Sequence, residues 1–120
     1  MENSSPLLVI KRNSEFVSLK QNGKRLWPTK WLLLNYQINE QQQFRFGVTA
    51  SRKVGPAVVR NKIKRWCREY FRNYLKSGNV LEVDINIICK PIDHGFYRGL
   101  SYAEFEKALE RGLESIGKNI

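Results

Sequence analysis

The sequence predicts an α+β fold, in which one sheet carries helices packed mainly on one of its faces. Apolar residues recur at the helical period in two long segments, and in three other segments they alternate or cluster as they do in strands. The segments follow one another in the order α-β-β-α-β-α along only 120 residues, a length that suits one domain. We expect that domain to span residues 1–120, with an ordered core over residues 7–116.

The first half of the chain predicts one short helix and two strands. The helix can be capped by Asn13 or Ser14 and is expected to end at Gly23. Strands are predicted over residues 31–38 and 44–50, and a further strand can form around residues 24–28. A polar turn separates the first two of these strands, which are therefore expected to pair as a hairpin.

The second half begins with the clearest helix, over residues 57–75. Its apolar side chains form a single stripe: Val59, Ile63, Trp66, Tyr70 and Tyr74. A strand over residues 82–90 follows, in which apolar and polar residues alternate. A last helix starts with a predicted capping box formed by Ser101 and Glu104.

The charge of the chain points to a polyanionic partner. The chain carries 21 Lys and Arg against 11 Asp and Glu, a net charge of +10. Residues 45–72 hold nine of the basic residues against Glu69 alone: Arg45, Arg52, Lys53, Arg60, Lys62, Lys64, Arg65, Arg68 and Arg72. Like charges one helical turn apart oppose helix formation. A function therefore explains them better than a merely solvated face, which would mix both signs.

RNA is the polyanion that the sequence favours. Membrane-surface binding would need the apolar face of the helix, which has to cover the sheet, and the motifs of the common duplex-DNA binders are missing. Stacking surfaces for unpaired bases could come from Phe16, Tyr36, Phe44 and Phe46, although core packing is the simpler interpretation of most of them. Trp27 and Trp31 could lie in the core or contact RNA, and core packing is the favoured interpretation.

Other residue patterns bear on catalysis and location. Asp84, Asp93 and His94 form no obvious cluster for metal-dependent or acid–base hydrolysis, so we expect no catalytic residue and no metal site on the protein. Cys67 and Cys89 are expected to be reduced and buried. The sequence shows neither a transmembrane segment nor the pattern of a secretory signal, which predicts a cytoplasmic protein without a membrane partner.

The segment Arg60-Asn61-Lys62-Ile63-Lys64-Arg65-Trp66-Cys67-Arg68-Glu69 resembles the signature helix of the bacterial ribonuclease P protein component. The preceding residues 47–55 and the first helix around Phe16 are also similar to that family. The resemblance extends through the strand that ends at Pro91 to the last helix, and it covers residues 7–115.

This resemblance implies both a fold and a function. The fold is an α/β sandwich with a central mixed sheet and a left-handed βαβ crossover. The function is to bind the catalytic RNA of ribonuclease P and the 5′ leader of precursor tRNA, while the RNA holds the Mg²⁺ ions and removes the leader. No small-molecule substrate is implied. The RNA-contacting helix residues would be Arg60, Asn61, Lys62, Lys64, Arg65 and Arg68, and a leader cleft between this helix and the sheet would contain Phe16, Arg52 and Lys53.

The sequence departs from the family at three positions. Lys62 stands where Arg is usual, and Lys20 and Leu34 stand where relatives often carry aromatic residues. Tyr36 or Phe46 could substitute for the missing aromatics. Two alternatives stay open: a ribosomal-type RNA-binding protein and a generic single-strand RNA-binding protein, neither with an enzymatic role.

Overall fold

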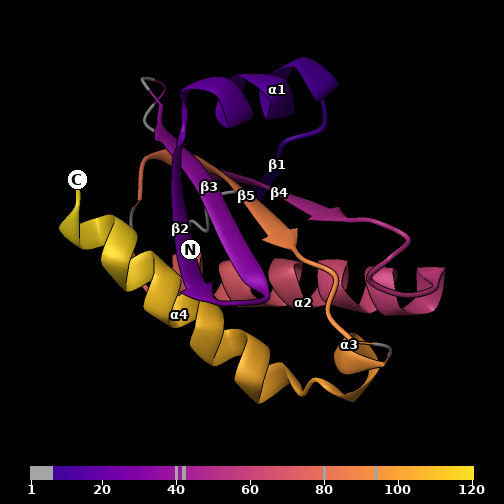
Figure 1. Cartoon of the computed structure of the whole chain (residues 1–120). Helices are drawn as coiled ribbons and strands as arrows, with labels where there is room; N and C mark the ends of the chain where they lie inside the picture. The colour runs from indigo at the N-terminus through magenta and orange to yellow at the C-terminus, as the bar shows by residue number, and fades with distance from the viewer. Residues whose placement is uncertain (1–6, 40, 42, 80, 94) are drawn as a thin grey trace.

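The computed structural model describes residues 7–120 apart from 40, 42, 80 and 94. Its centre is a mixed five-stranded sheet with strand order β1-β4-β5-β3-β2, flanked by helices (Figure 1). The elements are β1 (Leu8–Val9), α1 (Asn13–Asn22), β2 (Lys24–Thr29), β3 (Leu32–Ile38), β4 (Arg45–Ala50), α2 (Ala57–Lys76), β5 (Val83–Cys89), α3 (Phe96–Gly99) and α4 (Tyr102–Lys118). The predicted α+β class is confirmed, and so is the further strand after the first helix.

The predicted hairpin between β3 and β4 is wrong, because β5 lies between these two strands. β5 pairs antiparallel with β3 and parallel with β4, and β3 forms its hairpin with β2 instead. The alternating residues Val83, Ile85, Ile87 and Cys89 are all buried, so β5 takes the central position where both of its edges are paired. The β4-α2-β5 segment is the βαβ unit that the resemblance implies.

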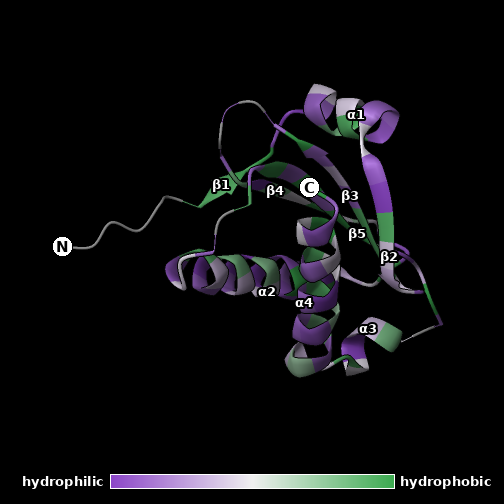
Figure 2. Ribbon diagram, turned by 90° about the vertical axis from the view of Figure 1, so that its left-hand side faces the viewer, coloured by the Kyte–Doolittle hydropathy of each residue, from purple (hydrophilic) through white to green (hydrophobic). Residues whose placement is uncertain are grey.

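The core lies on one face of the sheet, beneath α2 and α4 (Figure 2). On α2, the ring of Phe71 packs against Phe44 and Phe46 of β4, with centroids 4.9 and 4.8 Å apart. The predicted stripe of α2 is buried at Val59, Ile63 and Tyr70, whereas Trp66 and Tyr74 are only half-buried. Cys67 and Phe71 complete the buried side of α2. On α4, the apolar side is buried in the same core: Phe105, Leu109, Leu113 and Ile116.

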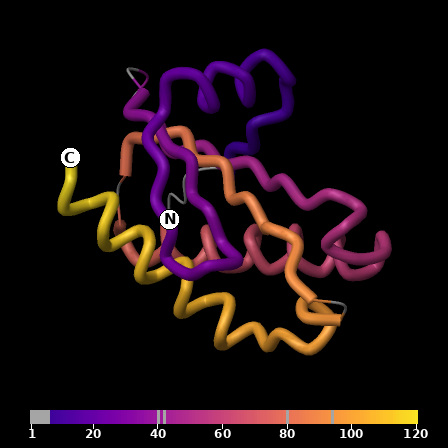
Figure 3. The backbone as a smooth tube through the Cα atoms, in the orientation of Figure 1, coloured from indigo at the N-terminus to yellow at the C-terminus, as the bar shows by residue number. Residues whose placement is uncertain are grey.

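Helix α1 lies on the opposite face of the sheet. The backbone tube in Figure 3 shows α1 and α4, which come from opposite ends of the sequence, on opposite sides of the strands. A side chain at Gly47 in β4 would run into the ring of Phe16, so α1 sits directly on this part of the sheet. The helices are therefore distributed over both faces.

The helix ends agree in part with the prediction. The capping box of α4 is present, with the Ser101 hydroxyl accepting from the Glu104 N–H at 3.2 Å. Gly23 ends α1, and its N–H donates to the Leu19 carbonyl. The N-cap of α1 is Arg12, with no side-chain capping bond, so the prediction of Asn13 or Ser14 is wrong. Within the described ranges, no helix is both long enough and apolar enough to cross a membrane.

Candidate nucleic-acid interface

Helix α2 presents a row of cations to solvent. It carries seven basic residues and one acidic residue, and its apolar side is turned into the core. The exposed positions include most of the predicted RNA-contacting residues: Asn61, Lys64, Arg65 and Arg68, together with Arg72. Within the described part of the chain the only ion pairs are those of Arg45, so no carboxylate there neutralises the cations of α2. A polyanion would relieve their mutual repulsion.

Arg60 and Lys62 are tied to the protein itself. Arg60 Nε donates to the Gly55 carbonyl at 3.1 Å, at the start of α2. Lys62 Nζ donates to the Tyr97 carbonyl at 3.1 Å and lies 4.8 Å from the centroid of the Trp66 ring. Both side chains are half-buried, so they are less available to a ligand than their exposed neighbour Asn61.

The predicted cleft residues line two separate hollows. Arg52 and Lys53 border a hollow of about 520 Å³ at the start of α2, together with Arg98 from α3. Phe16 lines a hollow of about 640 Å³ on the other face of the sheet. The expected position of Phe16 between the basic helix and the sheet is wrong, because Phe16 belongs to α1, which lies on the sheet face opposite α2.

The hollow under α1 combines aromatic, cationic and polar side chains. Its lining consists of Asn13, Phe16, Val17, Lys20, Arg25, Trp27, Leu33, Asn35, Thr49, Asn86, Ile88 and Lys90. The residues from β3, β4 and β5 all belong to the sheet face that points away from the core, as the two-residue period of strands requires. This lining resembles the single-strand binding surfaces that join a positive groove to exposed rings.

The structure corrects the assignment of aromatic platforms. Tyr36 and Phe46 are 4% and 1% exposed on the core face, so neither can substitute in the hollow. Leu34 is fully buried on that same face, and Leu33 is the residue of β3 that borders the hollow. Trp27 is 51% exposed there, which contradicts the expectation that it is a core residue. Trp31 and Phe44 are in the core.

Sequence reasoning favoured the core for Trp27 because it could not show that β2 is an edge strand. An edge strand has only one neighbouring strand, and Trp27 on β2 is 51% exposed. The signal that could have favoured the other interpretation is the position of Trp27 between Arg25 and Lys30, since an aromatic residue among cations is typical of nucleic-acid surfaces.

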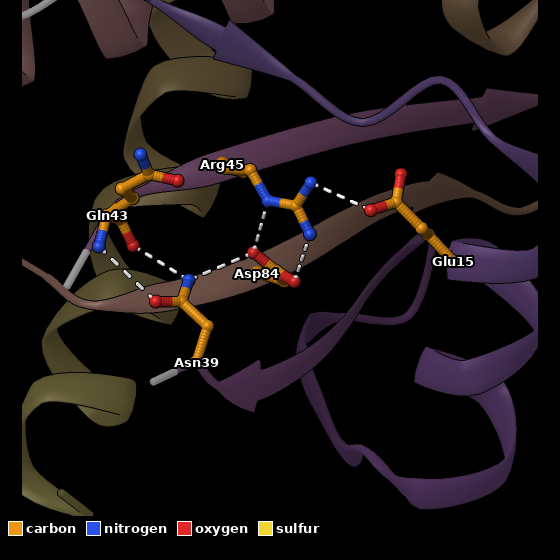
Figure 4. A network of polar contacts seen from close by, with 5 residues as sticks. All are labelled: Glu15, Asn39, Gln43, Arg45 and Asp84. Carbon is orange, nitrogen blue, oxygen red and sulfur yellow. Dashed lines mark hydrogen bonds and ion pairs between the residues drawn. The ribbon is translucent and has the colours of Figure 1, made fainter. Parts of the chain in front are cut away.

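A polar network fastens α1 to the sheet (Figure 4). Arg45 of β4 donates from Nε to Asp84 Oδ1 at 2.9 Å and from Nη2 to Asp84 Oδ2 at 2.7 Å. Its Nη1 donates to Glu15 Oε2 at 2.8 Å, on the first turn of α1. These carboxylates raise the pKa of Arg45 above its ordinary value. Asn39 Nδ2 also donates to Asp84 Oδ1 at 2.9 Å, and Asn39 exchanges hydrogen bonds with the backbone of Gln43.

The titratable groups offer little for catalysis. Asp84 is committed to Arg45, and the described ranges contain no group of three or more His, Cys, Asp or Glu that could hold a metal ion. His94 lies outside the described residues. Cys67 and Cys89 are free and buried, as expected, and burial raises the pKa of both thiols, that of Cys89 to about 12. Neither thiol is a nucleophile near neutral pH.

Comparison with known proteins decides the family. The sequence model of the family described as Ribonuclease P matches residues 6–117. The chain belongs to the ribonuclease P protein family. A ribonuclease P protein component from Staphylococcus epidermidis is 37% identical over 105 residues, covering 88% of this chain and 86% of that protein. One from a Geobacillus species is 33% identical over 109 residues, covering 90% and 89%.

Solved structures of ribonuclease P proteins share the fold. The Staphylococcus aureus protein superposes with a TM-score of 0.76 at 27% identity, covering 91% of this chain and 94% of that one. The Thermotoga maritima protein gives 0.77 at 25% identity, covering 88% and 94%. The resemblance carried by the Arg60 motif is thus confirmed at the level of the family, while the roles of the individual residues stay predictions.

Proposed function

We propose that this chain is the protein subunit of a ribonuclease P, binding the catalytic RNA and the 5′ leader of precursor tRNA and assisting removal of the leader. The observation that carries the proposal is the row of exposed cations on α2 in a chain that belongs to this family. Within the described residues, none of these cations forms an ion pair with a carboxylate. Such a surface binds phosphates without reading sequence, as assembly with a large folded RNA requires.

The two candidate surfaces lie on opposite faces of one sheet. The exposed side of α2 is turned away from the core, and the hollow under α1 opens on the other side of the strands. A large RNA on α2 would therefore leave the hollow accessible. We assign α2 to the catalytic RNA and the hollow to the leader, because unpaired nucleotides can use the exposed ring of Trp27 and the half-buried ring of Phe16 beside the cations Lys20 and Arg25.

The reaction would be a Mg²⁺-dependent hydrolysis carried out by the RNA. Mg²⁺ prefers oxygen ligands, carboxylates among them. The carboxylates closest to α1 and the sheet, Glu15 and Asp84, are both held by Arg45. They do not fit a metal site in this arrangement, so the proposal gives the ions to the RNA. The part left to the protein is to lower the electrostatic cost of bringing two RNAs together.

The test is single-turnover cleavage of a precursor tRNA at near-physiological Mg²⁺. Four samples are compared: buffer, the protein, the ribonuclease P RNA of the same organism, and both together. The expected result is cleavage at the mature 5′ end that is far faster with both components. Cleavage by the protein alone would show a nuclease in its own right. No gain on adding the protein would favour the alternative, an RNA-binding protein without an enzymatic role.

A further inference from the structure

A third hollow lies between helices α2 and α4, which pack against each other beside the core (Figure 2). It has a volume of about 470 Å³. Its lining comes from α2, the segment that follows α2, and α4: Tyr70, Tyr74, Asn79, Glu110, Leu113 and Glu114. The chain carries 21 Lys and Arg, yet none of them is among these residues. The lining is thus negatively charged in a protein whose net charge is +10.

The Tyr70 hydroxyl is a polar group without a partner in this hollow. Tyr70 is 7% exposed, and its hydroxyl forms no hydrogen bond with any described residue. Every fully enclosed side-chain nitrogen or oxygen atom of the described residues has such a partner, so the hydroxyl reaches the surface, at the hollow that Tyr70 lines. Burial raises the pKa of Tyr70, and the charges of Glu110 and Glu106 raise it further. The neutral hydroxyl therefore offers its lone pairs to a donor.

The other polar side chains of the lining offer acceptors as well. Asn79 Nδ2 donates to the Tyr74 carbonyl at 3.1 Å. Since a carbonyl can accept only from the amide nitrogen, Asn79 Oδ1 is the atom left for a ligand. Glu110 and Glu114 add two carboxylates one turn apart on α4, and neither forms an ion pair with a described residue. Like charges at this spacing repel each other, so a cationic donor would be favoured here.

Tyrosine rings form the wall of the hollow on the side of α2. The rings of Tyr70 and Tyr74 lie with their centroids 6.2 Å apart and their planes at 22°. Aromatic rings attract organic cations and also cover the carbon chains that such cations carry. A metal ion fits less well, because the described ranges contain no group of three or more His, Cys, Asp or Glu that could hold one. Phosphates are repelled by the carboxylates.

We propose that this hollow binds a linear polyamine. One ammonium group lies between the Tyr70 hydroxyl and the Glu110 carboxylate, a second lies against Glu114, and the carbon chain between them covers the apolar wall. Positions one turn apart on a helix are separated by about 6 Å along its axis, a distance that a four-carbon spacer between two ammonium groups can match. The proposed function does not use this hollow, so the two proposals stand or fall separately.

The test titrates putrescine, a diamine with a four-carbon spacer, into the whole protein at low salt. Calorimetry measures the affinity, and we expect binding of one diamine with a dissociation constant of about 1 mM or lower, as a few partly exposed charge contacts supply. Butylamine, which has one ammonium group, should bind at least about fivefold more weakly. The NMR signals of the Tyr70 and Tyr74 rings should shift during the titration with putrescine.

Conservative variants connect the binding to the hollow. Glu110→Gln should weaken the binding of putrescine about fivefold. Tyr70→Phe should weaken it about threefold and leave the thermal stability unchanged, because the hydroxyl has no described partner to lose. Asp93→Asn is the matched control: it removes one charge from an exposed carboxylate that does not line the hollow, and it should change the affinity by less than about twofold.

Several results would overturn the proposal. The site is wrong if putrescine shows no saturable binding, or if Glu110→Gln and Asp93→Asn weaken binding equally. It is also wrong if the affinity is unchanged in both Glu110→Gln and Tyr70→Phe. Equal affinities for putrescine and butylamine would overturn the assignment of two ammonium groups. Displacement of putrescine by Mg²⁺ at a lower concentration than that of the diamine would show a metal site instead.

Discussion

Arg45 and Asp84 form a two-pronged ion pair across directly opposed positions of β4 and β5, with N–O distances of 2.9 and 2.7 Å. The Arg45 and Asp84 side chains are only 20% and 17% exposed, so water screens the pair weakly. The third prong of the guanidinium reaches Glu15 of α1. One side chain thus joins two parallel strands and positions the helix that covers the hollow.

Replacing Arg45 should destabilise the protein through the carboxylate that it leaves behind. Arg45→Met is expected to lower the free energy of unfolding by about 2–3 kcal/mol, because Asp84 would keep a largely buried charge without its fork. Urea denaturation at neutral pH measures the loss. The double variant Arg45→Met with Asp84→Asn should recover part of it. A single-variant loss below about 0.5 kcal/mol would show that the fork is not stabilising.

The exposed cations of α2 should determine the salt dependence of RNA binding. Arg65→Ala is expected to reduce the log–log salt slope for the ribonuclease P RNA by about 1, since one phosphate contact is lost. Lys107→Ala is the matched control, because Lys107 is an exposed cation on α4, whose surface carries both signs. Binding titrations at several salt concentrations measure the slope. Equal changes in both variants would mean that α2 is not the RNA surface.

Lys62 should behave differently from Arg65, although both belong to the predicted RNA-contacting motif. The Lys62 ammonium is held by the Tyr97 carbonyl and lies over the Trp66 ring. Lys62→Ala is therefore expected to cost about 1 kcal/mol of stability and to change the salt slope less than Arg65→Ala does. Thermal denaturation and the same titrations separate the two effects. If Lys62→Ala reduced the salt slope as much as Arg65→Ala does and left the stability unchanged, Lys62 would contact the RNA directly.

Sequence patterns predicted the helices and strands better than they predicted which strands pair with each other. Periodicity identifies a buried face, and it therefore located α2, α4 and β5 closely. It carries no information on which strand lies beside which, so the pairing of β3 with β4 was predicted wrongly. β1 and α3 have two and four residues, too few for any period to show.

The candidate site was predictable to a similar degree. The charge of α2 is visible in the sequence because like charges recur along one helix. The two hollows are not visible, since they depend on which face of the sheet each helix covers. Leu33 and Leu34 illustrate the limit: a shift of one residue along a strand moves a side chain from the hollow to the core.

The buried thiols predict a loss of stability in alkali. Burial raises the pKa of Cys89 from its ordinary 9.0 to about 12 and also raises the pKa of Cys67. The folded protein keeps these protons where the unfolded chain releases them. The contribution of the protonated thiols to stability is thus complete below about pH 9 and is lost as the pH rises towards 12. Each thiol lowers the free energy of unfolding by up to about 1.4 kcal/mol for each pH unit in this range.

Urea denaturation at several alkaline pH values measures this loss, and Cys89→Ala is the control that should make the dependence shallower. Burial raises the pKa of Tyr97 as well, which acts in the same direction and remains in the variant. Identical pH dependence with and without Cys89 would contradict the assignment of the effect to the thiol.

A side chain at Gly47 should change the hollow by displacing helix α1, and it should leave the core unchanged. A Cβ at this position would stand 2.5 Å from Cε1 of the Phe16 ring, so Gly47→Ala must push Phe16 and α1 away from the sheet. Crowding of this kind costs about 1–3 kcal/mol. We expect weaker binding of precursor tRNA by the holoenzyme and unchanged binding of mature tRNA, because only the leader would occupy the hollow.

Gly117→Ala in α4 is the matched control, since nothing lies within 4 Å of its added methyl group. Equal losses for precursor and mature tRNA in Gly47→Ala would place the leader outside the hollow, whereas a loss confined to the precursor would locate it between α1 and the sheet.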